Sequence, residues 1–237
     1  MESEHTIASI SELNNTGAIA LAHGKVKLAF TSFSDAIELM LVLCHNFSDE
    51  QISDSCGRFG GLSMEAALEK AKSAYTHFDH LTTTRFNHQH FVYQDALIFN
   101  PTLVLSPHAS RTHLPICFSM LLFNLGLTYH TVAKNVGEKA LMQAIFWYDT
   151  CLAQLHAAVP GTKSGSMKIL LAAMNNLAIS SYDLSHFPKV RHIFTILMEI
   201  VSSYSTDERP QNFPAAEMEG LLLNIILLHA VSIAPAA

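Results

Sequence analysis

Four histidines and an aspartate within a 14-residue stretch are the residues best suited to bind a metal ion: His77, Asp79, His80, His88 and His90. Imidazole nitrogens and carboxylate oxygens bind zinc, and ligands three residues apart can lie on one side of a helix. A catalytic zinc site also needs rigidly held ligands and an activating carboxylate, which this spacing does not supply. Solvated histidines are therefore the default interpretation, and we expect no metal and no cofactor. A metal-dependent enzyme or metal-binding protein that uses this cluster is the alternative.

Other motifs that could carry catalysis are incomplete. The run 161–164 (Gly-Thr-Lys-Ser) resembles the end of a phosphate-binding loop, but the preceding glycine and a leading strand are missing. Gly165-Ser166 lacks the flanking glycine of a nucleophile elbow. Cys44 and His45 are neighbours on a predicted helix, which points their side chains about 100° apart. We therefore expect no enzymatic activity and no catalytic residue.

A short pattern, leucine or methionine followed two residues later by asparagine, recurs four times. Its asparagines are Asn15, Asn124, Asn176 and Asn224. After three of the copies a small or β-branched residue precedes an aromatic one by four positions, at Ala29/Phe33, Ala144/Tyr148 and Val190/Phe194. Spacings of three and four put side chains on one helix face, so each copy predicts a pair of helices. A small residue in the first helix (Gly17, Gly126 or Ala178) lets the second approach, and the aromatic ring fills the gap.

These patterns predict an all-α single domain over 1–237, built as an array of antiparallel helix hairpins. The helix pairs fall at about 8–47, 113–158 and 166–204, and a C-terminal helix falls at about 213–233. Helix-breaking residues separate the elements, for example His23-Gly24 within the first pair and Pro160-Gly161 between two pairs.

The residues of the two patterns resemble the tetratricopeptide repeat signature, in a degenerate form. Those that carry the resemblance are Gly17, Ala29, Phe33, Ala36, Leu122, Leu125, Gly126, Tyr129, Ala144, Tyr148, Leu177, Ala178, Val190 and Phe194. The sequence Asn-Asn-Leu-Ala at 175–178 is similar to the repeat variant in kinesin light chains. The copies lie farther apart than the roughly 34 residues of the repeat, and the closing proline is mostly missing. The resemblance implies a superhelical array that acts as a protein-binding scaffold.

The stretch from about 49 to 112 reads as an insertion in this array. Residues 65–75 carry an amphipathic pattern typical of a helix. Alternating apolar residues at 91–93 and 96–99, around Gln94 and Asp95, predict a short β-hairpin. A degenerate fourth repeat that uses the helix at 65–75 is the alternative.

In a superhelix of helix pairs, the first helix of each pair lines the concave face. The resemblance therefore implies a groove that binds a peptide or partner segment, and its predicted wall is Asn14, Asn15, Ala18, Leu21, Phe123, Asn124, Leu127, His130, Asn175, Asn176, Ile179 and Tyr182. The register asparagines either hydrogen-bond a peptide backbone or bridge neighbouring helices. Chaperone-type members of the family bind a terminal carboxylate through basic residues on these helices, but 13–22, 122–129 and 174–182 contain none. We therefore expect a neutral or apolar partner segment.

Composition restricts the remaining function classes. Hydrophobic residues are 49% of the chain and charged residues only 14%, against about 25% in an ordinary soluble domain. The net charge is −6 and no basic run occurs, which argues against nucleic-acid or membrane partners. The acidic N-terminus carries no signal-peptide pattern, and four cysteines without a paired motif suit a reducing compartment. We expect an intracellular protein, cytoplasmic or nuclear.

The C-terminal helix is apolar nearly all round from Leu221 to Ile233. An array that ends in such a helix needs a cover for it, because repeat arrays usually end in a helix with a polar outer face. A homodimer through this helix is the favoured cover; the insertion or another partner protein are the alternatives. A structural subunit of a homo-oligomer is accordingly a further alternative function.

Overall fold

A computed structural model describes residues 2–46, 58–59, 62–75, 92–99, 110–158, 164–203 and 215–233 of the chain. These residues form eight α-helices and one short pair of antiparallel strands. The predicted all-α class is therefore confirmed for this part of the chain.

Six of the helices form three antiparallel pairs, each joined by a tight turn. The pairs are α1 (Glu2–Ala22) with α2 (Val26–Asn46), α6 (Ser110–Val136) with α7 (Glu138–Ala158), and α8 (Ser164–Asp183) with α9 (Phe187–Ser203). Each turn contains one residue with positive φ: Gly24 (70°), Gly137 (86°) and Ser185 (59°). A left-handed residue directly after a helix lets the turn amides bond the last helical carbonyls, as Gly24 N–H does to Leu21 (2.9 Å).

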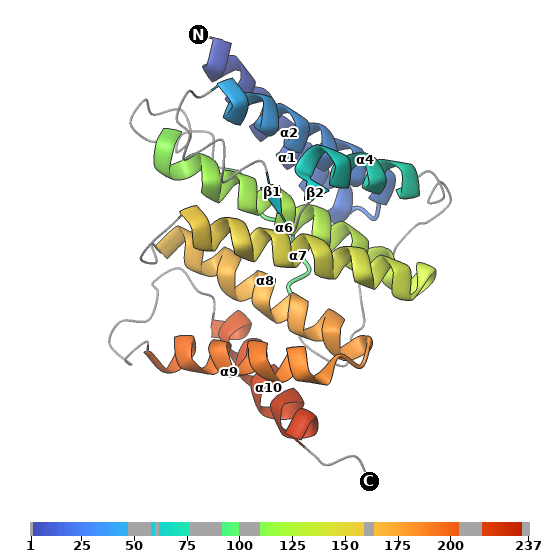
Figure 1. The fold of residues 1–237 in the computed structure, drawn as a ribbon, viewed down its shortest axis with the longest axis vertical. Helices are drawn as coiled ribbons and strands as arrows, with labels where there is room; N and C mark the ends of the chain where they lie inside the picture. The colour runs from blue at the N-terminus through green and yellow to red at the C-terminus, as the bar shows by residue number, and fades with distance from the viewer. Residues whose placement is uncertain are drawn as a thin grey trace.

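The helices stack in chain order, so that the two termini lie at opposite ends of the molecule (Figure 1). The first helices contact one another in series, α1 with α6, α6 with α8, and α8 with α10 (Ala215–Ile233). Each second helix packs on its own first helix, and α2, α7 and α9 also pack on the first helix of the next element. The first helices therefore form one continuous layer, and α2, α7 and α9 form the other.

Within two of the pairs, glycine allows the predicted close approach. A Cβ atom built on Gly17 would lie 2.7 Å from Phe33 Cε1, and one on Gly126 would lie 2.9 Å from Tyr148 Cε1. Phe33 and Tyr148 are both fully buried. Any side chain at either glycine would occupy space that the aromatic ring already fills, since protein interiors are close-packed.

Helix α6 lies at the centre of the core. Its stretch His113–Val136 is long and apolar enough to cross a membrane, but most of this stretch is buried inside the molecule. Phe118, Leu121, Leu122 and Phe123 in this stretch are inaccessible to solvent. The apolar character is therefore accounted for by the neighbours α2, α7 and α8, which contact α6.

The described part of the insertion adds a helix at the side of the array. Helix α4 (Met64–Tyr75) packs on α2, where Lys72 forms an ion pair with Glu38. Tyr129 of α6 donates a hydrogen bond from its hydroxyl to the Ala71 carbonyl (3.2 Å). The strands β1 (Arg58–Phe59) and β2 (Leu62–Ser63) pair antiparallel just before α4.

The predicted β-hairpin around Gln94 and Asp95 is not found in the described residues 92–99. This segment carries no strand pairing, and it bends at Asp95. Its backbone amides are bonded by asparagine side chains of the first helices. The hydrogen-bonding partner of these amides is a row of helices and not a second strand.

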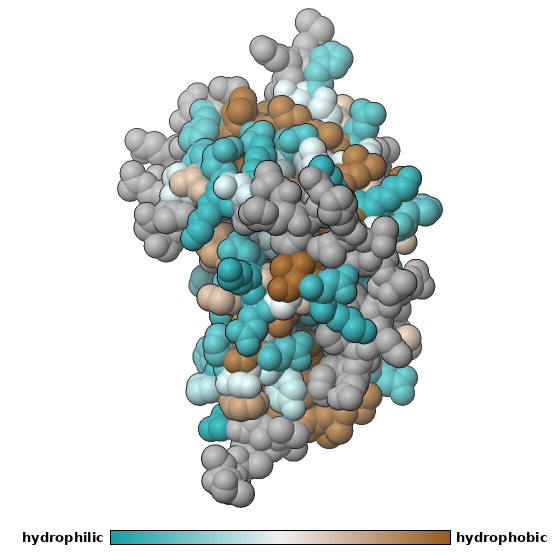
Figure 2. All heavy atoms as spheres, turned by 90° about the vertical axis from the view of Figure 1, so that its right-hand side faces the viewer, coloured by the Kyte–Doolittle hydropathy of each residue, from teal (hydrophilic) through white to brown (hydrophobic). Residues whose placement is uncertain are grey.

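Helix α10 packs on α9 and α8. Leu221, Ile225 and Leu228 are buried, whereas Leu222, Leu223, Ile226 and Leu227 are between 40% and 66% exposed. Figure 2 shows hydrophobic surface toward this end of the molecule, among mostly hydrophilic residues. The dimer expected from the sequence concerns this exposed face and stays a prediction.

Candidate functional site

An extended segment of the chain, residues 92–99, crosses the layer of first helices; we refer to it as the internal segment. In Figure 1 it is the thin green trace in the middle of the stack, between α4 and α6 in sequence. In an extended chain the N–H and C=O groups of alternate residues point to the same edge. Tyr93, Leu97 and Phe99 share that parity, so one edge of the segment can face the helices throughout.

Each of these three residues is held through both of its backbone groups by one asparagine. Asn176 accepts from the Tyr93 N–H (2.9 Å) and donates to the Tyr93 carbonyl (3.0 Å). Asn124 does the same for Leu97, with both distances 2.8 Å. Asn15 bonds Phe99 at 2.9 Å through its oxygen and 3.1 Å through its nitrogen. A carboxamide that donates and accepts in this way replaces the edge of a neighbouring β-strand.

Further asparagine contacts orient the three residues that bond the segment through both donor and acceptor. Asn14 accepts a hydrogen bond from Asn124 Nδ2 at 2.8 Å and donates to the Leu97 carbonyl at 2.9 Å. Asn175 accepts from Asn224 Nδ2 at 2.8 Å and donates to Asn176 Oδ1 at 3.3 Å. We name the set of six the asparagine row: Asn14, Asn15, Asn124, Asn175, Asn176 and Asn224.

The row repeats one arrangement at two places in the array. On α1 and on α8 an Asn-Asn pair supplies one residue that holds the segment, Asn15 or Asn176. Its neighbour, Asn14 or Asn175, accepts a bond from an asparagine on the next first helix. Hydrogen bonds between neighbouring helices thus position the carboxamides. Such bonds preorganise the carboxamides for a ligand.

Because these asparagines are buried, loss of one of their hydrogen bonds would cost free energy of folding. Asn14, Asn124, Asn175 and Asn176 are inaccessible to solvent, and Asn224 is 1% exposed. A hydrogen bond contributes about 0.5 to 1.5 kcal/mol net, whereas a buried polar group without a partner costs about 1 to 3 kcal/mol. Buried carboxamides therefore require an occupant with free backbone amides, and the internal segment supplies them.

The side chains of the internal segment divide into buried and exposed positions. Val92, Tyr93 and Phe99 are buried, whereas Ile98 is 64% exposed and Asp95 is also exposed. Burial is the main cause that raises the pKa of the Tyr93 hydroxyl, and the charge of Glu217 adds to it. The segment is therefore anchored by aromatic residues near its two ends.

The other predicted groove residues lie apart from the internal segment's backbone bonds. Ala18, Leu21, Leu127 and Ile179 are buried in the core. His130 is buried beside Tyr148 and Ser180, with its Nδ1 3.3 Å from each hydroxyl oxygen. The Phe123 ring also packs on Tyr148 (5.7 Å between centroids), and Tyr182 packs on Phe187 (5.8 Å). The structure thus brings together the asparagines of the predicted set and places the remaining members in helix seams.

Tyr93, Leu97 and Phe99 are part of the site, although sequence reasoning did not assign them to it. The available signal was the apolar alternation at 91–93 and 96–99, which predicts the two arms of a β-hairpin around Gln94 and Asp95. Of the two alternatives for these asparagines, the bridge between neighbouring helices is seen, because Asn124 donates to Asn14 and Asn224 donates to Asn175. Asn15, Asn124 and Asn176 also bond backbone groups, but these belong to the chain's own internal segment, so binding of a partner peptide stays a prediction.

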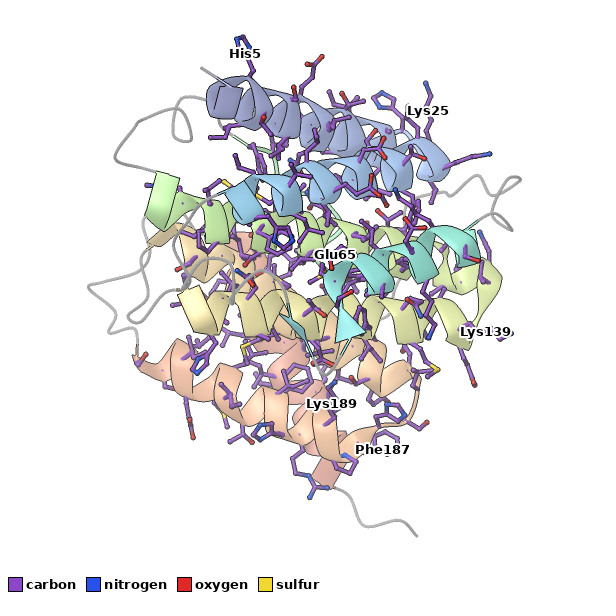
Figure 3. All side chains as sticks on the ribbon, turned by 45° about the horizontal axis from the view of Figure 1, so that its top comes forward. His5, Lys25, Glu65, Lys139, Phe187 and Lys189 are labelled. Carbon is purple, nitrogen blue, oxygen red and sulfur yellow. The ribbon has the colours of Figure 1, made fainter. Side chains whose placement is uncertain are left out.

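The row itself is uncharged. Lys25 and Lys139 point outward from the helices in Figure 3. The charged pair formed by Lys168 and Glu217 (3.2 Å) joins α8 to α10. The carboxamides suit a neutral backbone and offer no cation for a carboxylate or phosphate.

A metal centre finds no support in the described part of the chain. No group of three or more histidine, cysteine, aspartate or glutamate side chains comes together there. The histidine cluster at 77–90 lies outside the described residues, so its metal-binding alternative stays a prediction.

Comparisons of the chain with protein-family models, with curated proteins and with solved structures found no match.

Cys117 and Cys151 are expected to react slowly with a thiol reagent in the native protein. Both are buried, and burial raises the pKa of Cys117 to about 12 and also raises that of Cys151. The Cys151 thiol additionally donates to the Ser119 carbonyl (3.2 Å). Since the thiolate is the reactive form, maleimide labelling followed by peptide mass spectrometry should modify both only after denaturation. Rapid labelling of both in the native state would show that the seam between α6 and α7 is open.

Proposed function

We propose that this chain is a non-enzymatic protein-interaction scaffold of the tetratricopeptide type, whose asparagine row binds an extended segment of a partner protein. The groove wall is the layer of first helices α1, α6, α8 and α10. The partner segment lies across these helices and is held by its backbone.

The bidentate bonds from Asn15, Asn124 and Asn176 to three residues of one edge of an extended chain are the observation that carries this proposal. Backbone bonds of this kind supply affinity, while alternate side chains supply specificity, as in strand addition to a sheet edge. The orienting bonds within the row add preorganisation, which lowers the entropy cost of binding.

The chemistry of the row favours binding over catalysis. Carboxamides neither titrate nor act as nucleophiles, and a general acid or base must reach the reacting proton within hydrogen-bond distance. The imidazole of His130, another residue of the predicted groove wall, is buried against Tyr148 and Ser180. The proposed activity is accordingly recognition of a segment, with no covalent step.

A peptide added in trans tests the proposal on a chain whose own anchors are weakened. The variant Tyr93→Ala/Phe99→Ala keeps all six asparagines and removes the two buried aromatic side chains of the internal segment. We expect an acetylated, amidated and fluorescein-labelled peptide of residues 92–99 to bind this variant saturably in fluorescence anisotropy.

Two further replacements provide the control. Adding Asn124→Ala should weaken peptide binding by about tenfold or more, because the peptide loses both bonds at one position. Adding Thr16→Ala, at an exposed position of α1 next to the row, should leave it unchanged. Absence of saturable binding, or binding that ignores Asn124, would disprove the proposed function. Circular dichroism melts verify that each variant is folded.

A further inference from the structure

The internal segment makes its connection to the row through groups that every peptide has. Seven hydrogen bonds join Asn14, Asn15, Asn124 and Asn176 to the backbone of Tyr93, Leu97 and Phe99 in the described residues. A backbone bond does not depend on the side chain of the residue that makes it. The row therefore accepts any extended chain that presents amides at the same three positions.

The helices also contact one another without help from the segment. α1, α6, α8 and α10 pack in series and against their paired helices. The bonds from Asn124 to Asn14 and from Asn224 to Asn175 join side chains of the helices alone. The binding surface is thus built by the array, and the internal segment occupies it as a ligand would.

On these grounds we propose that the internal segment is a built-in competitor, and that the partner is an extended apolar peptide that replaces it in the asparagine row. This inference rests on the proposed function. It adds both the chemical class of the partner and the way access to the site is regulated.

The internal segment specifies what the partner must carry. Tyr93 and Phe99 are buried six residues apart, so the partner needs a large apolar or aromatic side chain at each of these two positions. Asp95 and Ile98 are exposed, so their equivalents are unrestricted. Proline has no N–H and is therefore excluded at the positions of Tyr93, Leu97 and Phe99, whose N–H groups are bonded.

Two adjacent proline substitutions in the full chain test the competition. Leu97→Pro removes the N–H that bonds Asn124, whereas the Ile98 N–H lies on the opposite edge of an extended chain. Both variants carry the same rigid residue in the same segment. The difference in peptide binding between the two variants therefore reports the hydrogen bond from the residue 97 N–H to Asn124.

Binding of the labelled 92–99 peptide is then measured for three chains. We expect the dissociation constant for Leu97→Pro to be at least about tenfold lower than for the wild type. In this variant the internal segment no longer occupies the row, so it no longer reduces the apparent affinity for the peptide. Ile98→Pro should stay within about twofold of the wild type, since its row remains occupied. Equal binding by all three chains would overturn the competitor role and leave the proposed function standing. Binding by none would overturn both.

Hydrogen exchange on the wild-type chain gives a second measurement that needs no variant. Addition of unlabelled peptide at several millimolar, above the roughly millimolar effective concentration of the tethered segment, should accelerate exchange of the Tyr93, Leu97 and Phe99 amides of the chain itself, because the displaced segment loses its bonds. Mass separates the chain's own fragments from the added peptide. If these amides exchange only with global unfolding, with or without peptide, the segment is an integral part of the core and the inference is wrong. A Leu97→Pro chain that fails to fold would lead to the same conclusion.

Discussion

Replacement of Gly126 by valine is expected to destabilise the protein by about 3 kcal/mol or more, the upper end of what an overpacked core residue costs. The first added carbon would lie 2.9 and 3.0 Å from the Tyr148 ring and 3.2 Å from Trp147 Cβ. The ring cannot turn away freely, because the Tyr148 hydroxyl accepts from Asn176 Nδ2 (3.2 Å). Trp147 Cβ is attached directly to the α7 backbone, so the steric overlap can be removed only if α6 and α7 move apart.

Urea denaturation of Gly126→Val measures this loss, and Met142→Val provides the matched control. Met142 is 59% exposed on α7, so valine there reports the helix propensity of a β-branched residue alone, about 0.5 kcal/mol. A loss at Gly126 no larger than at Met142 would mean that the helices separate without cost. At Gly17 only atoms of the Phe33 ring are in the way, so Phe33→Leu should partly rescue Gly17→Ala in a double-mutant cycle.

Asn176→Leu is expected to lower the free energy of unfolding by about 2 to 4 kcal/mol, since it leaves buried polar groups without their partner. Asn176 bonds the N–H and C=O of Tyr93 and the hydroxyl of Tyr148, all in buried surroundings. Leucine matches the shape of asparagine but offers neither donor nor acceptor. The same urea titrations measure the effect.

Asn15→Leu is the matched comparison, with an expected loss of about 1 kcal/mol. Asn15 makes the same pair of bonds to Phe99, but these bonds are only partly buried, so water can replace the lost partner. An equal loss at both positions would contradict the role of burial. In Asn176→Leu the internal segment can leave the row, so that water solvates the Tyr93 backbone. The free energy of this local opening sets an upper limit on the loss of stability.

Much of the helical framework could be predicted from local sequence. Spacings of three and four and the breaks at Gly24 and Gly137 are short-range signals that operate within one helix or turn. The contact of Gly126 with Tyr148 was also predictable, because small and aromatic residues recur in register along paired helices. The first helix begins at Glu2 and not near residue 8. Acidic residues at 2 and 4 favour a helix N-terminus through its dipole, a weak signal that the apolar pattern did not contain.

The segment bonded to the asparagine row could not be predicted in the same way. Alternation at 91–99 indicates an extended backbone, but it does not say which groups bond the amides. The bonds that hold the segment join residues 27, 83 or 84 positions apart, for example Leu97 with Asn124, Tyr93 with Asn176 and Phe99 with Asn15. Such pairings depend on how the helices stack, and no local pattern in the segment encodes them.

The covalent attachment of the internal segment to the array sets a threshold for any partner. A tethered ligand acts at an effective concentration on the order of millimolar. A free peptide present at micromolar concentration must therefore bind the row about a thousandfold more tightly than the isolated sequence of residues 92–99 would. A partner that also contacts a second surface of the array would reach that threshold with a modest affinity at each contact, because its own segment would then be tethered as well.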